Sequence, residues 1–381
     1  MGEHPTTAEI DLQALDQNLA QAVFCARGRP ILGVVKANAY GHGALPLARR
    51  LSIRGVQMLG VAFLNEGIEL REGGITLPVL LLAGCFREEV AEVFEHRLIP
   101  VVYDQSVVEA LGRVASSRGG VCPVHVKADT GMGRIGLREK EILSFVERAA
   151  ATMGIRVEGV LSHFSEADIE DRSSASEQIR RMREIRQGLM DRGIQIPFYH
   201  MANSAAVMDL PAAHLDLVRP GLMLYGYSPF EKRSPLALRP ILGWFTRISA
   251  LKRVPAGTPI SYGRTFVTQR ESLIATVPIG YADGYPRSLS NRGEMIVRGI
   301  RVPVVGRVCM DMLMLDVTEV PGLSAHERVT VLGEDGGESI FADELARRSG
   351  TIPYEILCGI GRRVARYYRD PGEGTAGSKG G

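Results

Sequence analysis

A lysine that follows a short apolar run is the first candidate for chemistry in this chain. Residues 31–35 are typical of a buried strand, Lys36 comes where that strand should end, and a loop with Tyr40 and two glycines follows. Lysine is among the side chains that a protein core tolerates least. A desolvated amine, however, is a nucleophile that forms Schiff bases. Lys36 is therefore a candidate catalytic residue, and the alternative is a lysine whose amine reaches water at a strand end.

The elements around Lys36 follow a regular order. Several short runs are apolar without strict alternation, which is typical of parallel strands buried on both faces. Amphipathic helical patterns lie between the runs. This alternation predicts a (β/α)8 barrel, a TIM-type fold, in residues 1–235, because that fold takes about 250 residues. The expected strands are residues 31–35, 57–62, 78–83, 98–102, 123–128, 157–162, 197–201 and 215–219.

The sequence pattern changes after residue 235. Residues 236–331 are rich in Val, Ile and Thr and contain turn sequences with Gly, Pro, Asn and Asp, which predicts short antiparallel strands. One helix is expected near residues 341–349, ending at Gly350. We therefore expect a mostly antiparallel β domain over residues 236–370. The glycine-rich residues 371–381 are expected to be disordered.

Composition narrows the class of protein. The net charge of +2 gives no reason to expect a nucleic acid or an anionic membrane as partner. The five cysteines include no C-x-x-C pair, which argues against a disulfide framework and a zinc ribbon, so we expect no metal. The chain shows no signal peptide and no apolar stretch of membrane-spanning length. A cytoplasmic protein is the expectation.

Polar residues gather where the expected barrel strands end. Active sites of such barrels are built at the C-terminal ends of the strands. Each residue has an ordinary alternative, since His163 could be a core histidine, Asn203 a helix N-cap and Arg219 part of a turn. Their common position at successive strand ends favours a functional mouth. The residues are Lys36, Lys127, Asp129, His163, His200, Asn203, Ser204 and Arg219.

The loops after the seventh and eighth strands suggest a phosphate site. In this fold phosphate groups commonly bind there, on backbone N–H groups and a helix N-terminus. Ser204 and the N–H groups of Gly221 and Leu222 fall at that place. Glycine at position 221 lets the backbone approach an anion. Together with a phenol such as Tyr40 and a lysine that can hold an aldehyde, this predicts pyridoxal 5′-phosphate as cofactor.

Long motifs in this chain resemble those of the alanine racemases. They occur in the family's order, and the resemblance covers about residues 6–368. It implies a barrel plus a β domain that acts as a head-to-tail homodimer, with each active site completed by the partner's C-terminal domain. The motifs are residues 34–43 (VVKANAYGHG), 127–134 (KADTGMGR), 162–164 (SHF), 203–205 (NSA), 218–221 (VRPG), 261–263 (SYG), 280–284 (GYADG), 306–311 (GRVCMD) and 353–355 (PYE).

The resemblance implies a pair of bases. Racemisation removes the α-proton from one face of the substrate and returns a proton to the other. By resemblance, Lys36 serves the D-isomer face, and Tyr262 from the other subunit serves the L-isomer face. A tyrosine has an ordinary pKa of about 10 and needs cationic or hydrogen-bonding help to act as a base. His163 resembles the residue that hydrogen-bonds this tyrosine, with Arg219 behind it, whereas outside the family context Tyr262 would be an aromatic core residue.

The resemblance also implies how the substrate is bound. Arg134 and the backbone of Met310 are expected to bind the substrate carboxylate. Tyr281 and Asp311 are expected at the substrate entrance. Tyr354 is expected near the phosphate, where it narrows the entrance to side chains of about methyl size.

Two further expectations concern charge. Arg219 is expected to face the pyridine nitrogen of the cofactor and to disfavour its protonation. Lys127 lies beside Arg134 at the mouth, where two cations repel each other. We expect Lys127 either to be carbamylated, as it often is in the family, or to be paired with chloride.

The reaction implied is the interconversion of L-alanine and D-alanine, which supplies D-alanine for peptidoglycan. Three alternatives remain. A decarboxylase of the same barrel class would place a carboxylate, and not Arg219, at the ring nitrogen. A non-catalytic pyridoxal-phosphate carrier would lack the β domain with Tyr262. A broad-specificity racemase is usually exported, and this chain shows no signal peptide.

Overall fold

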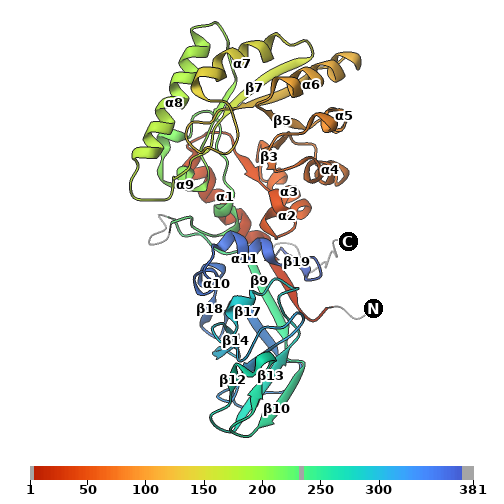
Figure 1. Ribbon diagram of the computed structural model, residues 1–381, viewed down its shortest axis with the longest axis vertical. Coiled ribbons are helices and arrows are strands. Elements are labelled where there is room, and N and C mark those ends of the chain that lie inside the picture. Colours follow the sequence, from red (N-terminus) through yellow and green to blue (C-terminus); the bar gives the residue numbers. More distant parts are fainter. Residues whose placement is uncertain (1–3, 231–235, 371–381) are drawn as a thin grey trace. The chain divides into compact units, whose positions relative to one another are not determined.

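The computed structural model describes residues 4–230 and 236–370 (Figure 1). These residues form two compact units. The barrel unit contains the described residues within 16–39 and 44–238. The β unit contains those within 1–15, 40–43 and 239–381. The predicted disordered tail, residues 371–381, lies outside the described residues.

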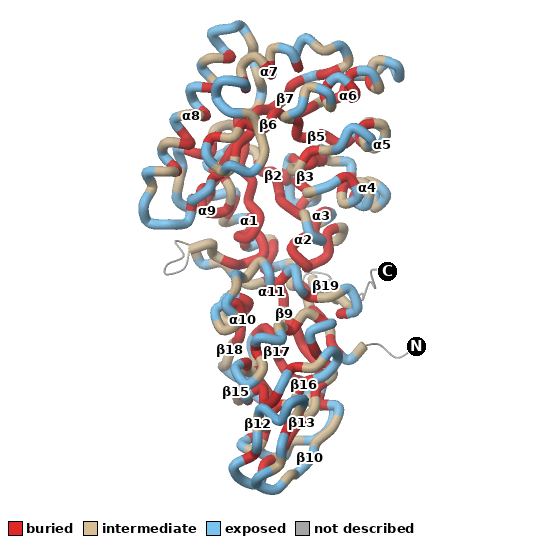
Figure 2. The backbone as a smooth tube through the Cα atoms, in the orientation of Figure 1, coloured by how far each residue is buried: buried red, intermediate tan, exposed pale blue. Residues whose placement is uncertain are grey.

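Seven parallel strands follow one another around the barrel unit in chain order. The first four are completely buried and the last three are mostly buried, which agrees with their apolar sequences (Figure 2). Each predicted run from the first to the seventh overlaps one of these strands, although β6 and β7 begin one and two residues before their predicted runs. They are β2 (Leu32–Val34), β3 (Met58–Val61), β4 (Val79–Leu81), β5 (Ile99–Val102), β6 (Cys122–Lys127), β7 (Ile155–Leu161) and β8 (Phe198–His200).

The eighth predicted run closes the barrel as a bridge rather than as a full strand. Val218 forms a parallel bridge with Ile31, and its carbonyl accepts from the Leu32 N–H at 2.9 Å. On the other side, the Arg219 N–H donates to the Ala202 carbonyl at 2.9 Å. The run stays short because Leu215 has a positive φ of 51° and the residue after Arg219 is a proline, which has no N–H to donate.

Helices follow the strands around the barrel unit, as the alternation predicts (Figure 1). In the longest of them, α8, the apolar residues Ile179, Met182, Ile185 and Leu189 form the buried face. The helices are α1 (Leu12–Ala26), α3 (Ala44–Ile53), α4 (Leu64–Glu72), α5 (Val90–Glu95), α6 (Gln105–Ser117), α7 (Glu139–Ala151), α8 (Ser173–Met190) and α9 (Ser204–Asp209).

The β unit is built mainly from antiparallel strands, which together with the barrel confirms the predicted fold class. The order in its largest sheet is β15-β14-β17-β9-β1-β19, with β18 paired to β17. The strands are β1 (Thr7–Asp11), β9 (Leu242–Arg247), β14 (Glu294–Val297), β15 (Ile300–Pro303), β17 (Arg328–Asp335), β18 (Glu338–Ile340) and β19 (Ala365–Arg369).

Smaller sheets and two helices complete the β unit. β10 (Ala250–Val254), β13 (Ser272–Val277) and β16 (Leu313–Asp316) form a three-stranded sheet. β11 (Pro259–Ile260) pairs with β12 (Phe266–Val267). The predicted helix is α10 (Ala342–Ser349), and Gly350 ends it in a left-handed conformation. A second helix, α11 (Pro353–Gly359), was not predicted.

The N-terminal strand β1 was also not predicted. It pairs antiparallel with β9 and parallel with the final strand β19, so it lies inside the largest sheet of the β unit. Sequence analysis grouped this segment with the barrel because it precedes the first barrel strand in the chain. Its short alternating pattern gave no sign that its partners lie more than 200 residues away.

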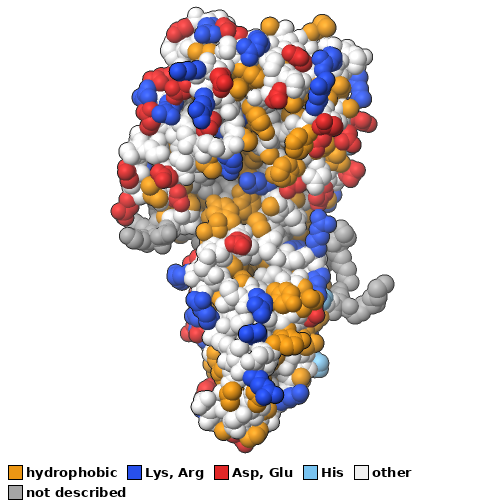
Figure 3. All heavy atoms as spheres, in the orientation of Figure 1, with side chains coloured by type: hydrophobic (Ala, Val, Ile, Leu, Met, Phe, Trp, Pro, Cys, Tyr) orange, Lys and Arg blue, Asp and Glu red, His pale blue; other side chains and the backbone are white. Residues whose placement is uncertain are grey.

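The surface carries mixed charges with hydrophobic side chains among them (Figure 3). Arg180 on α8 is paired with Glu177 and Glu184 on the same helix, which is the arrangement of a solvated helix face. The cysteines are free. In the part of the chain that the structure describes, no helix has the length and hydropathy needed to cross a membrane.

The position of β1 generates a stability prediction. Ile10 is fully buried in this strand. Ile10→Ala should therefore lower the free energy of unfolding by about 2–5 kcal/mol, because it removes buried methyl groups and leaves a cavity. Ile53→Ala, at a position that is 76% exposed, is the matched control and should change stability by less than about 0.5 kcal/mol. Thermal and urea unfolding of both variants would measure this, and equal small effects would contradict the central place of β1.

Candidate active site

Lys36 begins an unusual left-handed turn. Val35 still continues the hydrogen bonding between β2 and β3, since its N–H donates to the Gly60 carbonyl at 2.8 Å. The next residues after Lys36, from Ala37 to Tyr40, all have φ between 51° and 54°. None of them is glycine, and a left-handed helical conformation costs about 1–2 kcal/mol for each such residue. Strain of this kind persists only where surrounding contacts impose it.

Hydrogen bonds within the barrel unit hold the turn. The Ala37 N–H donates to Glu66 Oε1 at 2.6 Å, and Glu66 Oε2 accepts from the Ala62 N–H at 2.6 Å. The Asn38 side chain accepts from the Ala44 N–H at 2.8 Å, where α3 begins. The backbone that follows Lys36 is therefore fixed by two side chains, Glu66 and Asn38, that sequence analysis did not single out.

The residues that follow belong to the β unit. The Tyr40 ring lies 5.7 Å from the Tyr354 ring, and burial raises the pKa of Tyr40 far above its ordinary value. Gly41 and Gly43 have φ of 82° and 103°. A Cβ on Gly41 would lie 2.1 Å from the Leu357 carbonyl oxygen, so only glycine fits there. Two of the predicted cofactor-binding residues, Tyr40 and Tyr354, are thus in contact.

Arg219 is the central cation of the barrel mouth. It is 5% exposed and donates to the backbone oxygens of Ser162 at 2.7 Å and Met201 at 3.2 Å. Its Nη2 lies 3.3 Å from His163 Nδ1, and its Nη1 lies 2.9 Å from His200 Nδ1. Burial lowers the pKa of Arg219 to about 9, so the group stays cationic at neutral pH. Among the described residues no carboxylate contacts it.

The N–H groups of Arg219 determine the tautomers of His200 and His125. Because a guanidinium can only donate, His200 Nδ1 accepts, and His200 Nε2 must carry the hydrogen. That hydrogen points to His125 Nδ1 at 2.8 Å. His125 Nε2 is buried and has no partner among the described residues. Burial, followed by the nearby charge of Arg219, lowers the pKa of both histidines, so both are neutral.

Four basic side chains surround His163. Burial lowers its pKa most, followed by the charges of Arg219, Lys127, Arg134 and Lys36. With Nδ1 accepting from Arg219, the Nε2–H of His163 is free to donate, and no acceptor contacts it among the described residues. The structure therefore brings four predicted site residues of the barrel unit together around the imidazole of a fifth, His163.

Lys127 lies under a tight loop. It is 4% exposed, and its Nζ donates to the Ala128 carbonyl at 3.0 Å. Burial, then the charges of Arg219 and Arg134, lowers the pKa of Lys127 to about 7, although Asp129 acts in the opposite direction. Gly136 has a φ of 114°, and a Cβ there would lie 2.8 Å from Lys127 Cγ. The amine of Lys127 is therefore substantially neutral near pH 7.

Arg134 belongs to the same loop, which runs from Asp129 to Leu137. Asp129 accepts from the N–H groups of Gly131 and Gly133, and the Asp129 N–H donates to the Leu137 carbonyl at 2.9 Å. Arg134 is exposed and has no hydrogen-bond or ion-pair partner among the described residues. A guanidinium in this position is available for an anionic ligand.

The predicted phosphate site also comes together in the barrel unit. Ser204 is buried, and its Oγ accepts from the Gly221 N–H at 2.9 Å and the Met223 N–H at 3.3 Å. The Leu222 N–H between them has no acceptor among the described residues. Asn203 caps α9 and accepts from the Ala206 N–H at 3.1 Å. Two backbone donors and one hydroxyl therefore converge on one point.

The remaining predicted residues lie in the β unit. Tyr262, Met310 and Asp311 line a cavity of about 440 Å³ together with Met312. Tyr262 is 71% exposed, and Met310 and Met312 are about half exposed. The Met310 N–H has no acceptor among the described residues. Tyr281 lies on the loop beside this cavity, since its N–H donates to the Cys309 carbonyl at 3.1 Å.

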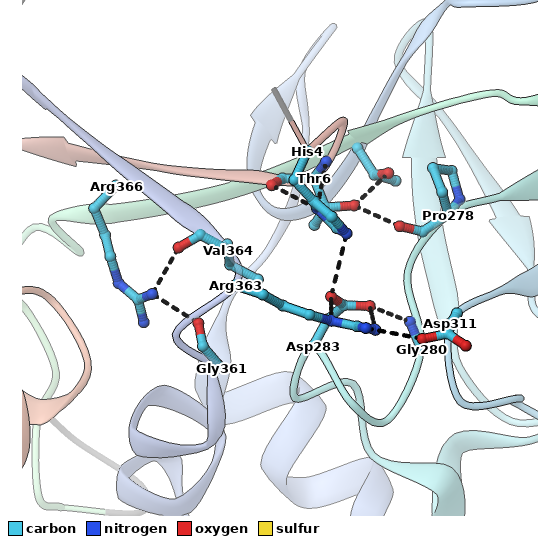
Figure 4. Close-up of polar contacts among 11 residues, drawn as sticks. His4, Thr6, Pro278, Gly280, Asp283, Asp311, Gly361, Arg363, Val364 and Arg366 are labelled. Carbon is cyan, nitrogen blue, oxygen red and sulfur yellow. Dashed lines mark hydrogen bonds and ion pairs between the residues drawn. The ribbon is translucent and has the colours of Figure 1, made fainter. Parts of the chain in front are cut away.

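An ion-pair cluster holds the two loops of this cavity (Figure 4). Arg363 bonds both oxygens of the fully buried Asp283, at 2.6 and 3.0 Å, and Asp311 at 2.8 Å. Asp283 also accepts from the Gly280 N–H at 2.8 Å. Arg363 thus connects the Tyr281 loop to Asp311, and sequence analysis missed it because the partners are 52 and 80 residues away.

Comparison with known proteins gives one family. Residues 10–229 match the family model "Alanine racemase, N-terminal domain", and residues 241–368 match "Alanine racemase, C-terminal domain". The chain is 45% identical to the alanine racemase of Halothermothrix orenii over 368 residues, which is 96% of this chain and 97% of that protein. It is 46% identical to alanine racemase 2 of Caldanaerobacter subterraneus over 376 residues, 97% of this chain and 96% of that protein.

Solved structures agree. The alanine racemase of Clostridium difficile superposes with a TM-score of 0.94 at 36% identity, covering 98% of both chains. The alanine racemase of Bacillus anthracis, solved with bound L-Ala-P, superposes with a TM-score of 0.92 at 35% identity, covering 98% of this chain and 97% of that one. These matches extend over both units of the chain.

The buried histidine pair generates a pH prediction. The pKa of His125 is lowered from 6.5 to about 3, first by burial and then by Arg219. Below about pH 6.5 the unfolded chain takes up a proton that the folded chain refuses until about pH 3, so stability is lost as the pH falls through this window. His125 should contribute up to about 1.4 kcal/mol per pH unit to that slope.

His125→Gln tests this contribution, because the amide can still accept from His200 without titrating. The difference in unfolding free energy between about pH 5 and about pH 7 should shrink in this variant. His326→Asn, at an exposed position, is the control and should keep the wild-type slope. An unchanged slope in His125→Gln would contradict the neutral, buried state of His125.

Proposed function

Because the chain belongs to the alanine racemase family, we propose that it interconverts L-alanine and D-alanine with pyridoxal 5′-phosphate as cofactor. The observation that carries the proposal is the buried Arg219, a cation with only neutral acceptors, next to His163 and the other cations of the barrel mouth. This argues against a decarboxylase with a carboxylate at the ring nitrogen, since no carboxylate among the described residues contacts Arg219.

The residues of the mouth fit this cofactor. Ser204 with the N–H groups of Gly221 and Leu222 suits a phosphate dianion, and the excess of cations around His163 needs a negatively charged group to balance it. The Nε–H of Arg219 has no acceptor among the described residues, which suits a pyridine nitrogen that accepts a hydrogen bond.

The remaining cofactor residues follow from these. Lys36 would hold the aldehyde, and Asn203, Tyr40 and Tyr354 would complete the surroundings. When bound, the cofactor withdraws electrons from the α-carbon and makes the α-proton acidic.

Two residues would then move protons at the α-carbon. The amine of Lys36 would remove or return the proton on the D-isomer face, and the partner subunit's Tyr262 would do so on the L-isomer face. The Nε2–H of His163 could donate to the phenolic oxygen of Tyr262, and the positive charge of Arg219 behind it would favour the phenolate. These two effects supply the help that an ordinary tyrosine lacks as a base.

A homodimer would bring these groups together. Tyr262, Met310 and Met312 are exposed around one cavity in a single chain, which leaves apolar surface for a second copy to cover. The substrate carboxylate would be bound by the exposed Arg134 and by the backbone N–H of the partner subunit's Met310. Tyr281, Asp311 and Tyr354 would line the entrance and favour a methyl side chain.

The reaction would take place in the cytoplasm, and its product, D-alanine, would be used for peptidoglycan synthesis. A broad-specificity racemase remains the second candidate, and it differs from an alanine racemase in accepting further amino acids as substrates. Serine is the first substrate to compare with alanine, because it adds a single hydroxyl to the methyl group.

Racemisation is tested with the purified holoenzyme and L-alanine in heavy water, followed by chiral chromatography with mass detection. We expect D-alanine that carries deuterium at Cα.

Tyr262→Phe should lower the rate of racemisation by about 10²–10⁴-fold, because the base of one face is removed. Tyr227→Phe, a tyrosine buried in the barrel unit, is the control for loss of a phenol and should keep most of the activity. Alanine that returns unlabelled and wholly L would refute the proposal, and serine, lysine and diaminopimelate would be tested next.

Lys127 generates a separate prediction. A neutral amine adds to carbon dioxide to give a carbamate and a proton, and the pKa of Lys127 near 7 makes this reaction accessible. The resulting anion would separate Arg134 and Arg219. Carbon-13 NMR of the enzyme in labelled bicarbonate should show one carbamate signal that Lys127→Met lacks and that Lys140→Met, at an exposed lysine, retains. Absence of both a signal and any dependence of activity on chloride would refute anionic balancing at this position.

A further inference from the structure

We infer that Gln178 is a positioning residue for the reaction proposed above: it holds the backbone of His163 against the loop that follows β6. Gln178 lies on α8 and is 2% exposed. Neither the motifs of the sequence nor the roles assigned so far include it. The inference rests on the proposed function, and its test is designed to separate the two.

All four hydrogen-bonding positions of the Gln178 amide are used. Its Nε2 donates to the His163 carbonyl at 2.9 Å and to Thr130 Oγ1 at 3.1 Å. Its Oε1 accepts from the Ser165 N–H at 3.0 Å and from Ser165 Oγ at 3.1 Å. The orientation of the amide is unambiguous, because a backbone carbonyl can only accept and a backbone N–H can only donate.

These partners lie on two different loops of the barrel mouth. His163 and Ser165 follow β7, whereas Thr130 follows β6 in the loop that leads to Arg134. A Cβ on Gly131 would lie 3.3 Å from Gln178 Cγ, so the β6 loop packs directly against this side chain. One amide therefore fixes the spacing between the two loops.

A chain of hydrogen bonds leads from Thr130, a partner of Gln178, to Arg219. Thr130 Oγ1 and Ser162 Oγ share a hydrogen bond at 2.7 Å, and the Ser162 carbonyl accepts from Arg219 at 2.7 Å. The His163 ring, one residue further, lies against the same guanidinium. Gln178 thus acts on the backbone of the histidine whose Nε2–H would support the partner subunit's Tyr262.

This arrangement predicts that substitution of Gln178 slows the proton transfer at Tyr262 and not the proton transfer at Lys36. A displaced His163 would weaken the support of Tyr262, which serves L-alanine, and would leave the Lys36 side unchanged. A small displacement at a reacting group costs rate steeply, so kcat/KM should fall about 10- to 100-fold in both directions. Both directions include the proton transfer at Tyr262, so this transfer should limit the overall rate of racemisation more strongly in the variant.

Kinetic isotope effects of the holoenzyme measure this shift. In Gln178→Met, the primary isotope effect on kcat/KM should rise for Cα-deuterated L-alanine and fall for Cα-deuterated D-alanine. Gln187→Met on the same helix is the matched control and should keep the wild-type pair of isotope effects. The Gln187 side chain is exposed, and among the described residues it bonds only Asp191. Gln178→Glu keeps the acceptors for Ser165 but loses the donors to His163, so it should shift both effects in the same directions if the methionine variant does not fold.

The outcomes separate the two proposals. A wild-type enzyme that does not racemise alanine refutes the proposed function, whatever the variants do. A wild-type enzyme that racemises alanine, with variants at position 178 that lose activity but keep both isotope effects, overturns the positioning role and leaves Gln178 as a stabilising residue only.

Discussion

The barrel mouth depends on a guanidinium cation that is buried without a carboxylate. Buried charges normally pair with an opposite charge, because desolvation is costly. Arg219 is instead surrounded by two backbone oxygens and two imidazoles. Its charge is stabilised by neutral acceptors but not cancelled, so it acts on everything around it. Burial first, and the charge of Arg219 after it, lowers the pKa of His163, His200, His125 and Lys127.

The surrounding backbone is correspondingly rigid. The left-handed turn after Lys36 has an intrinsic cost of about 1–2 kcal/mol per residue, and the carboxylate of Glu66 and the amide of Asn38 hold it. In the β unit, Arg363 holds the loops of Tyr281 and Asp311 through the buried Asp283. In both units, a side chain that never enters the candidate site fixes the backbone beside it, and this is how local strain can persist there.

The sequence predicted the residues whose place follows from chain order. Lys36, Lys127, His163 and Arg219 come directly after apolar runs, so their common end of the barrel follows from the order of strands and helices alone. The final strand β19 and its partner β1 could not be paired in this way, because no local pattern marks two segments more than 350 residues apart.

Partners within the site were harder to predict for the same reason. His125 occupies an ordinary strand position, and Gln178 is one polar residue on a helix that is otherwise typical of a barrel. Each becomes informative only through a tertiary contact, since hydrogen-bond geometry depends on which side chains the fold brings within about 3 Å. The strained turn at Ala37 was also invisible, because alanine carries no preference for a left-handed conformation.

The two units also differ in how they treat their proposed proton-transfer groups. In the barrel unit, the pKa values of His163 and Lys127 are lowered by burial and by neighbouring charges. In the β unit, Tyr262 is 71% exposed, beside half-exposed methionines. An exposed phenol in water is a poor base at neutral pH, and exposed apolar side chains around it lower the solubility of a single chain. Under the proposed function, one event would remove both problems: a second copy of the chain would cover this surface. Under the same proposal, the hydrogen bond from His163 that Tyr262 needs to act as a base would therefore exist only in the dimer, and activity would depend on the same contact that covers the apolar surface.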